Sequence, residues 1–147
     1  DHTKYSEARP IYTNAWVDVV SEEGQAAAAD YVACITQADL ADETKTAYYT
    51  NAFATAGYIE AVVFVEGLKR VEENGEVLNW DNYIEAMEQG PIDIPMGGTV
   101  DFSDGHRWGI DSMSLLQYTI TEVDGAEPTE AFIAVRPIET LTDISKK

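Results

Sequence analysis

The stretch from Pro95 to Gln117, PMGGTVDFSDGHRWGIDSMSLLQ, is where the character of the chain changes. It contains the glycine pair Gly97–Gly98, a Phe-Ser-Asp-Gly run and the pair Trp108–Gly109. Apolar residues before this stretch recur mainly at helical spacing, whereas those after it alternate as they do in half-buried strands. We therefore expect mainly helices first, paired strands afterwards, and a tight turn or close backbone crossing at the glycine pair.

The N-terminal third of the chain predicts a strand, a helix and a loop. Ile11–Val20 is rich in β-branched and aromatic residues, which favours a strand running into a loop. Gln25–Gln37 is rich in alanine and predicts a helix, whose expected apolar face consists of Ala28, Tyr31, Val32 and Ile35. Leu40–Thr50 is polar and mixed, so we interpret it as a loop containing at most a short helical turn.

A long helix is expected after Asn51. This asparagine directly precedes an apolar-rich segment, where its side-chain oxygen can accept a hydrogen bond from a free amide at a helix start. We predict a helix from Ala52 to about Asn74, ended by Gly75. Apolar residues cover most of its circumference near the middle, which predicts the most buried helix of the chain. Its expected core-facing stripe consists of Phe53, Gly57, Ala61, Phe64, Leu68 and Val71.

The rest of the chain predicts one more helix and four strands. Asn79 is the expected N-cap of a helix within Leu78–Met87, and Asp81 favours the helix start. The turn residues Val123–Gly125 separate two alternating segments and predict a terminal hairpin. Pro137 suggests that the last strand ends there or lies at an edge. The expected strands are Ile92–Ile94, Thr99–Phe102, Ser112–Glu122 and Ala131–Ile138.

Acidic residues dominate the charge of the chain. Its 147 residues include 27 Asp and Glu against 9 Lys and Arg, a net charge of −18 at pH 7. Such a surface repels phosphate groups, which argues against nucleic acid and anionic membranes as partners. The length suits one ordinary domain, and no apolar run approaches the roughly 18 residues that a membrane span requires. We therefore expect a soluble chain.

Neither the single cysteine nor the carboxylates predict a cofactor or a metal site. Cys34 lies in a helical apolar pattern and has no cysteine with which to form an internal disulfide, so we expect a buried structural thiol. A calcium loop needs acidic or amide ligands at alternating positions before a glycine. Asp101, Asp104 and Gly105 provide only two carboxylates at the wrong spacing.

The polar residues of the central stretch do not predict catalysis. Ser103, His106 and Asp111 can be arranged on paper as a triad, but all three lie in one short loop without a nucleophile elbow or an oxyanion element. We interpret this loop as a surface loop whose charges pair locally. Glu60 interrupts an apolar run and is expected at a helix edge or in a hydrogen bond. One hypothesis for the function is a small acidic hydrolase that uses Glu60 or His106.

Four aromatic residues suggest a binding pocket. Trp16 lies at a strand end, Phe53 and Tyr58 lie at the start of the long helix, and Trp108 lies in the central loop. They are suited to lining a pocket for an apolar or amphipathic small molecule. The same residue types are equally typical of a hydrophobic core, so both interpretations stay open.

Several motifs together resemble a known family. Asn51–Tyr58, NAFATAGY, continues into Phe64–Arg70, FVEGLKR, and is followed by Leu78–Met87, LNWDNYIEAM. With Met96–Gly98 and the residues up to Tyr118, this order is similar to the branched-chain amino-acid type of solute-binding proteins of bacterial ABC importers. The resemblance covers roughly residues 11–138. It implies an α/β fragment of the two-lobed type I periplasmic-binding-protein fold, with helices first and a C-terminal β-hairpin.

The resemblance implies that the chain is a C-terminal portion contributing to both lobes. Residues 11–37 and 112–138 would belong to the second lobe or the hinge, and residues 51–103 mainly to the first lobe. Residues 95–117 would pass from one lobe toward the other. The missing N-terminal portion of the same protein would then be a partner, and exposed apolar faces would favour self-association.

The implied function is non-catalytic binding of an amino acid or a related small carboxylate for ABC-type import, by closure of the lobes. The partners would be the solute and the membrane permease, outside the cytoplasm, in the periplasm or as a cell-surface lipoprotein. Phe53 matches an aromatic position near the family's cleft, Tyr58 matches the aromatic residue of the family's helix, and Trp16 is added because of its place at the strand end. The alternative is a ligand-sensing domain of a receptor or regulator with the same fold.

Overall fold

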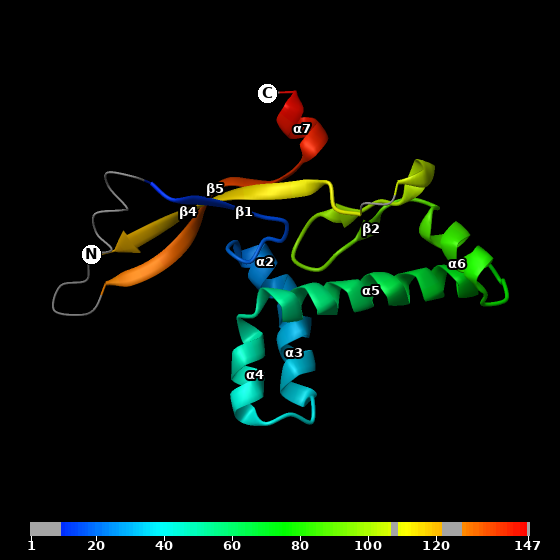
Figure 1. Cartoon of the computed structure of the whole chain (residues 1–147), viewed down its shortest axis with the longest axis horizontal. Coiled ribbons are helices and arrows are strands. Elements are labelled where there is room, and N and C mark those ends of the chain that lie inside the picture. The colour runs from blue at the N-terminus through cyan, green and yellow to red at the C-terminus, as the bar shows by residue number, and fades with distance from the viewer. Residues whose placement is uncertain (1–9, 107–108, 122–127, 147) are drawn as a thin grey trace.

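The computed structural model describes residues 10–106, 109–121 and 128–146, and it combines helices with small antiparallel sheets (Figure 1). This mixed content agrees with the predicted combination of α and β elements. The elements, in chain order, are β1 Tyr12–Ala15, α2 Glu22–Ala27, α3 Ala29–Gln37, α4 Asp42–Tyr49, α5 Ala52–Glu73, α6 Trp80–Met87, β2 Ile92–Asp93, β3 Thr99–Val100, the 3-10 turn η1 Ser103–Gly105, β4 Ser112–Thr121, β5 Thr129–Thr140 and α7 Leu141–Ser145.

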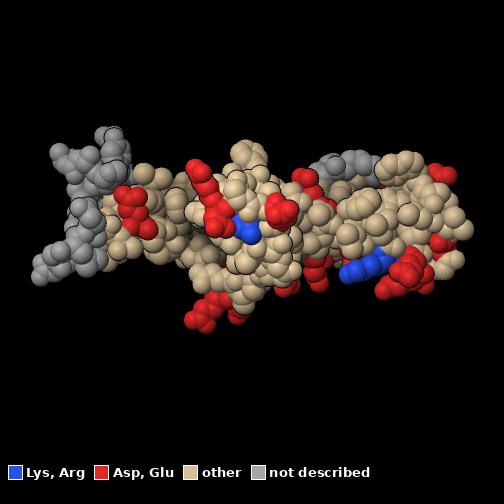
Figure 2. All heavy atoms as spheres, turned by 90° about the horizontal axis from the view of Figure 1, so that it is seen from below, with Lys and Arg blue, Asp and Glu red and all other residues tan. Residues whose placement is uncertain are grey.

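The chain exposes more surface than a compact protein of its mass. Its accessible surface is 10159 Å², whereas about 7,500 Å² is expected for a compact monomer of 16.2 kDa. Acidic side chains are spread along the face shown in Figure 2, with uncharged surface between them. The whole chain, including the residues that are not described, therefore has an accessible surface larger than the compact value by about 2,700 Å².

None of the helices in the described part of the chain combines the length and the apolar character that a membrane span requires.

The larger sheet has the strand order β1-β4-β5 and is antiparallel throughout. The pairing of β4 with β5 confirms the predicted terminal hairpin, although its turn, Val123–Gly125, lies outside the described residues. β1 lies on the other side of β4, with Tyr12 opposite Gln117. Pro137 lies in the edge strand β5, which continues beyond it to Thr140.

The two predicted helix starts are confirmed. The Oδ1 atom of Asn51 accepts hydrogen bonds from the backbone amides of Phe53 (2.9 Å) and Ala54 (3.1 Å) at the start of α5. The Oδ1 atom of Asn79 likewise accepts one from the amide of Asn82 (2.9 Å) at the start of α6. Gly75, just after α5, has a φ of 72°, as expected for a glycine that ends a helix.

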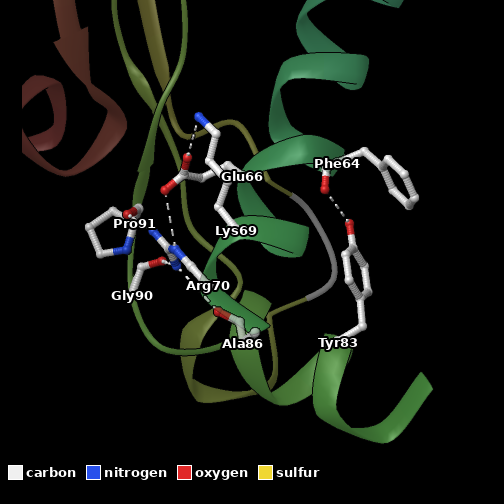
Figure 3. A network of polar contacts seen from close by, with 8 residues as sticks. All are labelled: Phe64, Glu66, Lys69, Arg70, Tyr83, Ala86, Gly90 and Pro91. Atoms are coloured by element: carbon white, nitrogen blue, oxygen red, sulfur yellow. Dashed lines mark hydrogen bonds and ion pairs between the residues drawn. The ribbon is translucent and has the colours of Figure 1, made fainter. Parts of the chain in front are cut away.

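A polar network holds α6 against α5 (Figure 3). The guanidinium group of Arg70 donates hydrogen bonds to the carbonyl oxygens of Ala86 (3.3 Å), Gly90 (3.0 Å) and Pro91 (2.8 Å). It also lies 3.7 Å from the carboxylate of Glu66, one turn earlier on α5. One side chain of the FVEGLKR segment therefore bonds to the last turn of α6 and to two carbonyls of the turn that leads into β2.

The predicted inward face of α5 is wrong. Phe53 is 88% exposed, and Gly57, Ala61 and Phe64 of the expected stripe are exposed as well. The buried residues of the helix are Ile59, Gly67 and Val71, of which only Val71 belongs to the expected stripe, and Leu68 of that stripe is half-buried. α5 packs against α6, against the turn between β2 and β3 and, through Tyr58, against α3. The helix is therefore packed against more than one element, but the face that carries Phe53, Ala61 and Phe64 is open.

Three predictions in the N-terminal part also need correction. Leu40–Thr50 is not a loop, because it contains the two-turn helix α4. The helix predicted at Gln25–Gln37 is divided at Ala28 into α2 and α3, and α2 already begins at Glu22. Cys34 is exposed and not buried, because α3 turns Tyr31 and Ile35 inward instead. The strand running into a loop that was expected over Ile11–Val20 is confirmed, with the strand limited to the four residues of β1.

A small core lies where α5 meets the turn between β2 and β3. Gly97 and Gly98 have φ values of 94° and 83°, which confirms the predicted tight turn. A Cβ atom on Gly98 would lie 2.5 Å from the Oγ atom of Ser112, so the turn also passes close to β4. The buried residues are Ile59, Ile94, Met96 and Val100, and the partly buried residues packed on them include Trp16, Val17, Ala28, Tyr58, Val63 and Phe102.

Candidate functional site

The three residues predicted to contact a ligand lie around the first turns of α5. Phe53 and Tyr58 belong to α5 itself, and Trp16 follows directly after β1. They line two different grooves, one shared by Phe53 and Tyr58 and one that includes Trp16. Trp108, the fourth aromatic residue of the predicted pocket, lies outside the described residues.

The Trp16 groove follows the junction between α4 and α5 and has a volume of about 520 Å³. One side comes from β1 and the segment after it, and the other comes from the end of α4 and the start of α5. On the second side, the Tyr49 hydroxyl is paired with that of Thr36 and the Thr55 hydroxyl donates to the Asn51 carbonyl, so Thr50 supplies the polar group that can orient a small solute beside the Trp16 ring. Its lining residues are Asn14, Ala15, Trp16, Val17, Val19, Tyr49, Thr50, Ala52 and Thr55.

Asp18 fixes the segment that carries Trp16. Its backbone amide donates to the carbonyl of Met96 (2.6 Å), and its carboxylate accepts hydrogen bonds from the Val20 amide, the Ser21 amide and the Ser21 hydroxyl. Partial burial acts to raise the pKa of Asp18, but these three hydrogen bonds outweigh it, so the pKa lies below its usual value. The charged carboxylate therefore stabilises the loop beside the groove.

Side-chain hydrogen bonds hold α4 beside α3. The Tyr31 hydroxyl donates to the carbonyl of Tyr48 (2.5 Å), and the Lys45 ammonium group donates to the carbonyl of Thr36 (2.9 Å). The hydroxyl oxygens of Thr36 and Tyr49 are 3.0 Å apart, which links the last turn of α4 to α3. These contacts place Tyr49 at the wall of the Trp16 groove.

The Phe53 groove is wider, with a volume of about 700 Å³, and lies between α3, α4 and the start of α5. Tyr58 forms part of its floor, and the Tyr58 and Tyr31 ring centroids are 5.4 Å apart at an interplanar angle of 52°. Burial, with smaller contributions from the charges of Asp30 and Cys34, raises the pKa of Tyr58, so its hydroxyl stays protonated. Phe53 projects at the rim and is free to contact a ligand or a second protein surface.

Asp101 and Ser103 of the central stretch contact each other locally. The Asp101 carboxylate accepts a hydrogen bond from the Ser103 amide (2.9 Å), and this backbone contact, followed by the Ser103 side chain, lowers the pKa of Asp101. Ser103 is thus engaged in a local turn next to His106. Glu60 is exposed on α5 and lines a third, apolar groove with Phe64. Among the described residues, no group of three His, Cys, Asp or Glu side chains could hold a metal ion.

Sequence reasoning missed the polar half of the Trp16 groove. The sequence predicts a loop for Tyr49 and Thr50, and it places Thr55 within an apolar-rich helix, where no ligand contact is expected. The adjacent tyrosines Tyr48 and Tyr49 immediately before the N-cap Asn51 were a usable signal, since paired aromatic residues seldom occur in a purely solvated loop.

The chain was also compared with known proteins. No protein-family model, no curated protein and no solved structure matches it.

Proposed function

We propose that this chain is the C-terminal portion of a type I periplasmic solute-binding protein that delivers an amino acid or a related small carboxylate to an ABC importer. The proposal rests on the motif order around the FVEGLKR segment and on one structural observation. That observation is the Trp16 groove, in which an aromatic wall faces hydroxyl groups at the junction of two helices.

The two helix ends beside this groove favour a zwitterion. α4 ends at Tyr49, and α5, which is 22 residues long, begins at Ala52. A helix carries partial negative charge at its C-terminal end and partial positive charge at its N-terminal end. The first turn of α5 also contains no acidic residue to repel a carboxylate. Asn51 already accepts from the Phe53 and Ala54 amides, and the Tyr48 carbonyl already accepts from Tyr31. The ammonium and carboxylate groups of an amino acid would therefore be attracted by the partial charges of the two helix ends and not by free amides or carbonyls.

The aromatic side chains would supply the apolar contacts in this proposal. Trp16 would contact the solute's side chain, while the hydroxyl of Thr50 would orient its polar groups. Phe53 and Tyr58 line the neighbouring groove and would be contacted by a larger solute or by the opposite lobe. Closure of the lobes would favour the bound state in proportion to the contacts that form only when the cleft is closed.

Large apolar side chains that are exposed on α5 and α6, among them Phe53, Phe64 and Trp80, support a role as part of a larger protein. Partners that would cover them are the remaining portion of the solute-binding protein and the permease. The function would be binding without chemical conversion.

Calorimetry and thermal unfolding with a panel of amino acids and small dicarboxylates would test the proposal. We expect at least one panel member to raise the melting temperature, because a ligand that binds only the folded state stabilises it. Thr50→Val removes one hydroxyl of the Trp16 groove and should weaken that binding at least tenfold, whereas Phe53→Ala reports on the neighbouring groove. Thr46→Val, whose hydroxyl only donates to the Asp42 carbonyl within α4, is the matched control.

Three results would argue against the proposal. If no panel member raised the melting temperature, the proposed ligand class would be wrong. If Thr50→Val and Thr46→Val weakened binding equally, the Trp16 groove would not be the binding site. Turnover of a bound solute would remove the non-catalytic role.

A further inference from the structure

An exposed apolar surface surrounds the start of α6. Val77 is 78% exposed, Trp80 74% and Leu78 62%, and about half of each of the Phe64 and Ile84 side chains is exposed. We call these five residues the α6 surface. Surface apolar residues scattered singly are ordinary, but a contiguous group of this size is typical of an interaction site.

Ring contacts make this surface continuous. The Tyr83 ring lies between Phe64 and Trp80, with centroid distances of 5.4 Å to the first and 6.1 Å to the second. The Tyr83 hydroxyl also donates to the carbonyl of Phe64 (3.3 Å), which fixes the ring. Ile84 lies four residues after Trp80 and therefore on the same face of α6. The Tyr83 ring thus joins the exposed side chains of Phe64 and Trp80, and its hydrogen bond holds the ring in this position.

Carboxylates border the α6 surface, and no cation lies within the segment. Residues 71–90, VEENGEVLNWDNYIEAMEQG, contain six acidic residues and no Lys, Arg or His. Asp81 and Glu85 follow Trp80 and Ile84 by one position each, so an exposed acidic stripe runs beside the apolar one. At the end of the molecule that carries α6, Figure 2 shows acidic side chains around uncharged surface, with basic side chains beside some of them. Lys69 and Arg70, which directly precede the segment, pair with Glu66. Apolar anchors with an acidic border favour a partner of opposite charge.

We propose that the α6 surface binds a cationic amphipathic segment of a partner protein. The apolar side chains of that segment would pack on Trp80, Leu78 and Ile84, and its Lys or Arg residues would face Asp81 and Glu85. A second copy of this chain is disfavoured because two acidic borders would repel each other, and anionic lipid is disfavoured for the same reason. The proposal stands on this surface alone and does not depend on solute binding in the Trp16 groove.

Fluorescence anisotropy with a labelled helical peptide of Leu and Lys residues tests the proposal, with the same peptide carrying Glu in place of Lys as the charge control. We expect only the Lys peptide to bind. Trp80→Ala should weaken its binding at least tenfold, because a central exposed tryptophan is the commonest kind of interface anchor. Asp81→Asn with Glu85→Gln should weaken binding several-fold at low salt, and this difference should vanish at high salt.

Tyr12→Ala is the matched control, because it removes an exposed aromatic side chain from β1, away from α6. Its affinity for the Lys peptide should equal that of the unchanged protein. The proposal is overturned by binding that is insensitive to Trp80→Ala, by equal binding of the Glu peptide, or by equal loss in Tyr12→Ala. It is also overturned if Trp80→Ala abolishes a dimer or the binding of zwitterionic vesicles, since a second copy or a lipid would then occupy the surface.

Discussion

Alanine substitutions at two glycines of α5 are expected to change the free energy of unfolding in opposite directions. An ideal Cβ atom at Gly57 would meet nothing within 4 Å, and the residue is exposed. Alanine is preferred over glycine in a helix interior by about 1 kcal/mol. Gly57→Ala should therefore stabilise the protein by about 1 kcal/mol.

Gly67 has the same helical backbone but a crowded environment. A Cβ atom there would lie 2.5 Å from the Sδ atom of Met87 and 2.6 Å from the Cε2 atom of Tyr83. Overpacking of this kind costs about 1–3 kcal/mol, which exceeds the gain of about 1 kcal/mol in helix propensity. We expect Gly67→Ala to destabilise the protein by about 1 kcal/mol, so that the two variants differ by about 2 kcal/mol.

Urea unfolding followed by far-ultraviolet circular dichroism measures both changes. The slope of free energy against urea should be the same for both variants and the unchanged protein, which makes their midpoints directly comparable. Stabilisation by Gly67→Ala equal to that by Gly57→Ala would refute the packing of α6 on α5. Destabilisation by Gly57→Ala would show that the originally predicted face of α5 is covered after all.

Three further outcomes are expected. Arg70→Met should lower the free energy of unfolding by about 2–3 kcal/mol because three carbonyl oxygens lose their donor, whereas Lys69→Met should change it by less than about 0.5 kcal/mol in the same urea assay. Asp18 has a lowered pKa in the folded state, so its contribution to stability is present above the unfolded-state pKa and is lost as pH falls through the folded-state pKa. Asp18→Asn should remove this contribution. Between about pH 6 and pH 3, the melting temperature of this variant should therefore fall less than that of the unchanged protein. Cys34 should react with a thiol reagent in the folded protein nearly as fast as in urea, and strong protection would contradict its exposed position.

Features that depend on neighbouring residues alone could be predicted from the sequence. The N-caps Asn51 and Asn79 are recognisable because their side chains bond to amides two or three residues away. The turn at Gly97–Gly98 is recognisable because only glycine tolerates its backbone angles at little cost. The terminal hairpin follows from alternating side chains on both sides of turn residues. None of these features needs knowledge of the rest of the fold.

The candidate site could be predicted only in part for the same reason. Trp16, Phe53 and Tyr58 stand out as large aromatic residues, but their division between two grooves depends on where α3 and α4 pack. The polar wall of the Trp16 groove depends on α4, whose sequence DETKTAYY has no strong apolar stripe. That helix is held to α3 by hydrogen bonds that involve Tyr31 and Thr36 of α3. These partners lie too far away in the sequence for a local pattern to reveal the contacts.

The sequence by itself determined where α5 and α6 start, where the chain turns and which strands form the hairpin, because short-range hydrogen bonds and backbone angles decide these features. Only the tertiary structure decided which face of α5 is buried, that Cys34 is exposed and that α4 exists. Apolar residues surround α5 on most sides, so its sequence was compatible with several buried faces. The close approach of Tyr83 and Met87 to Gly67 selects one of them.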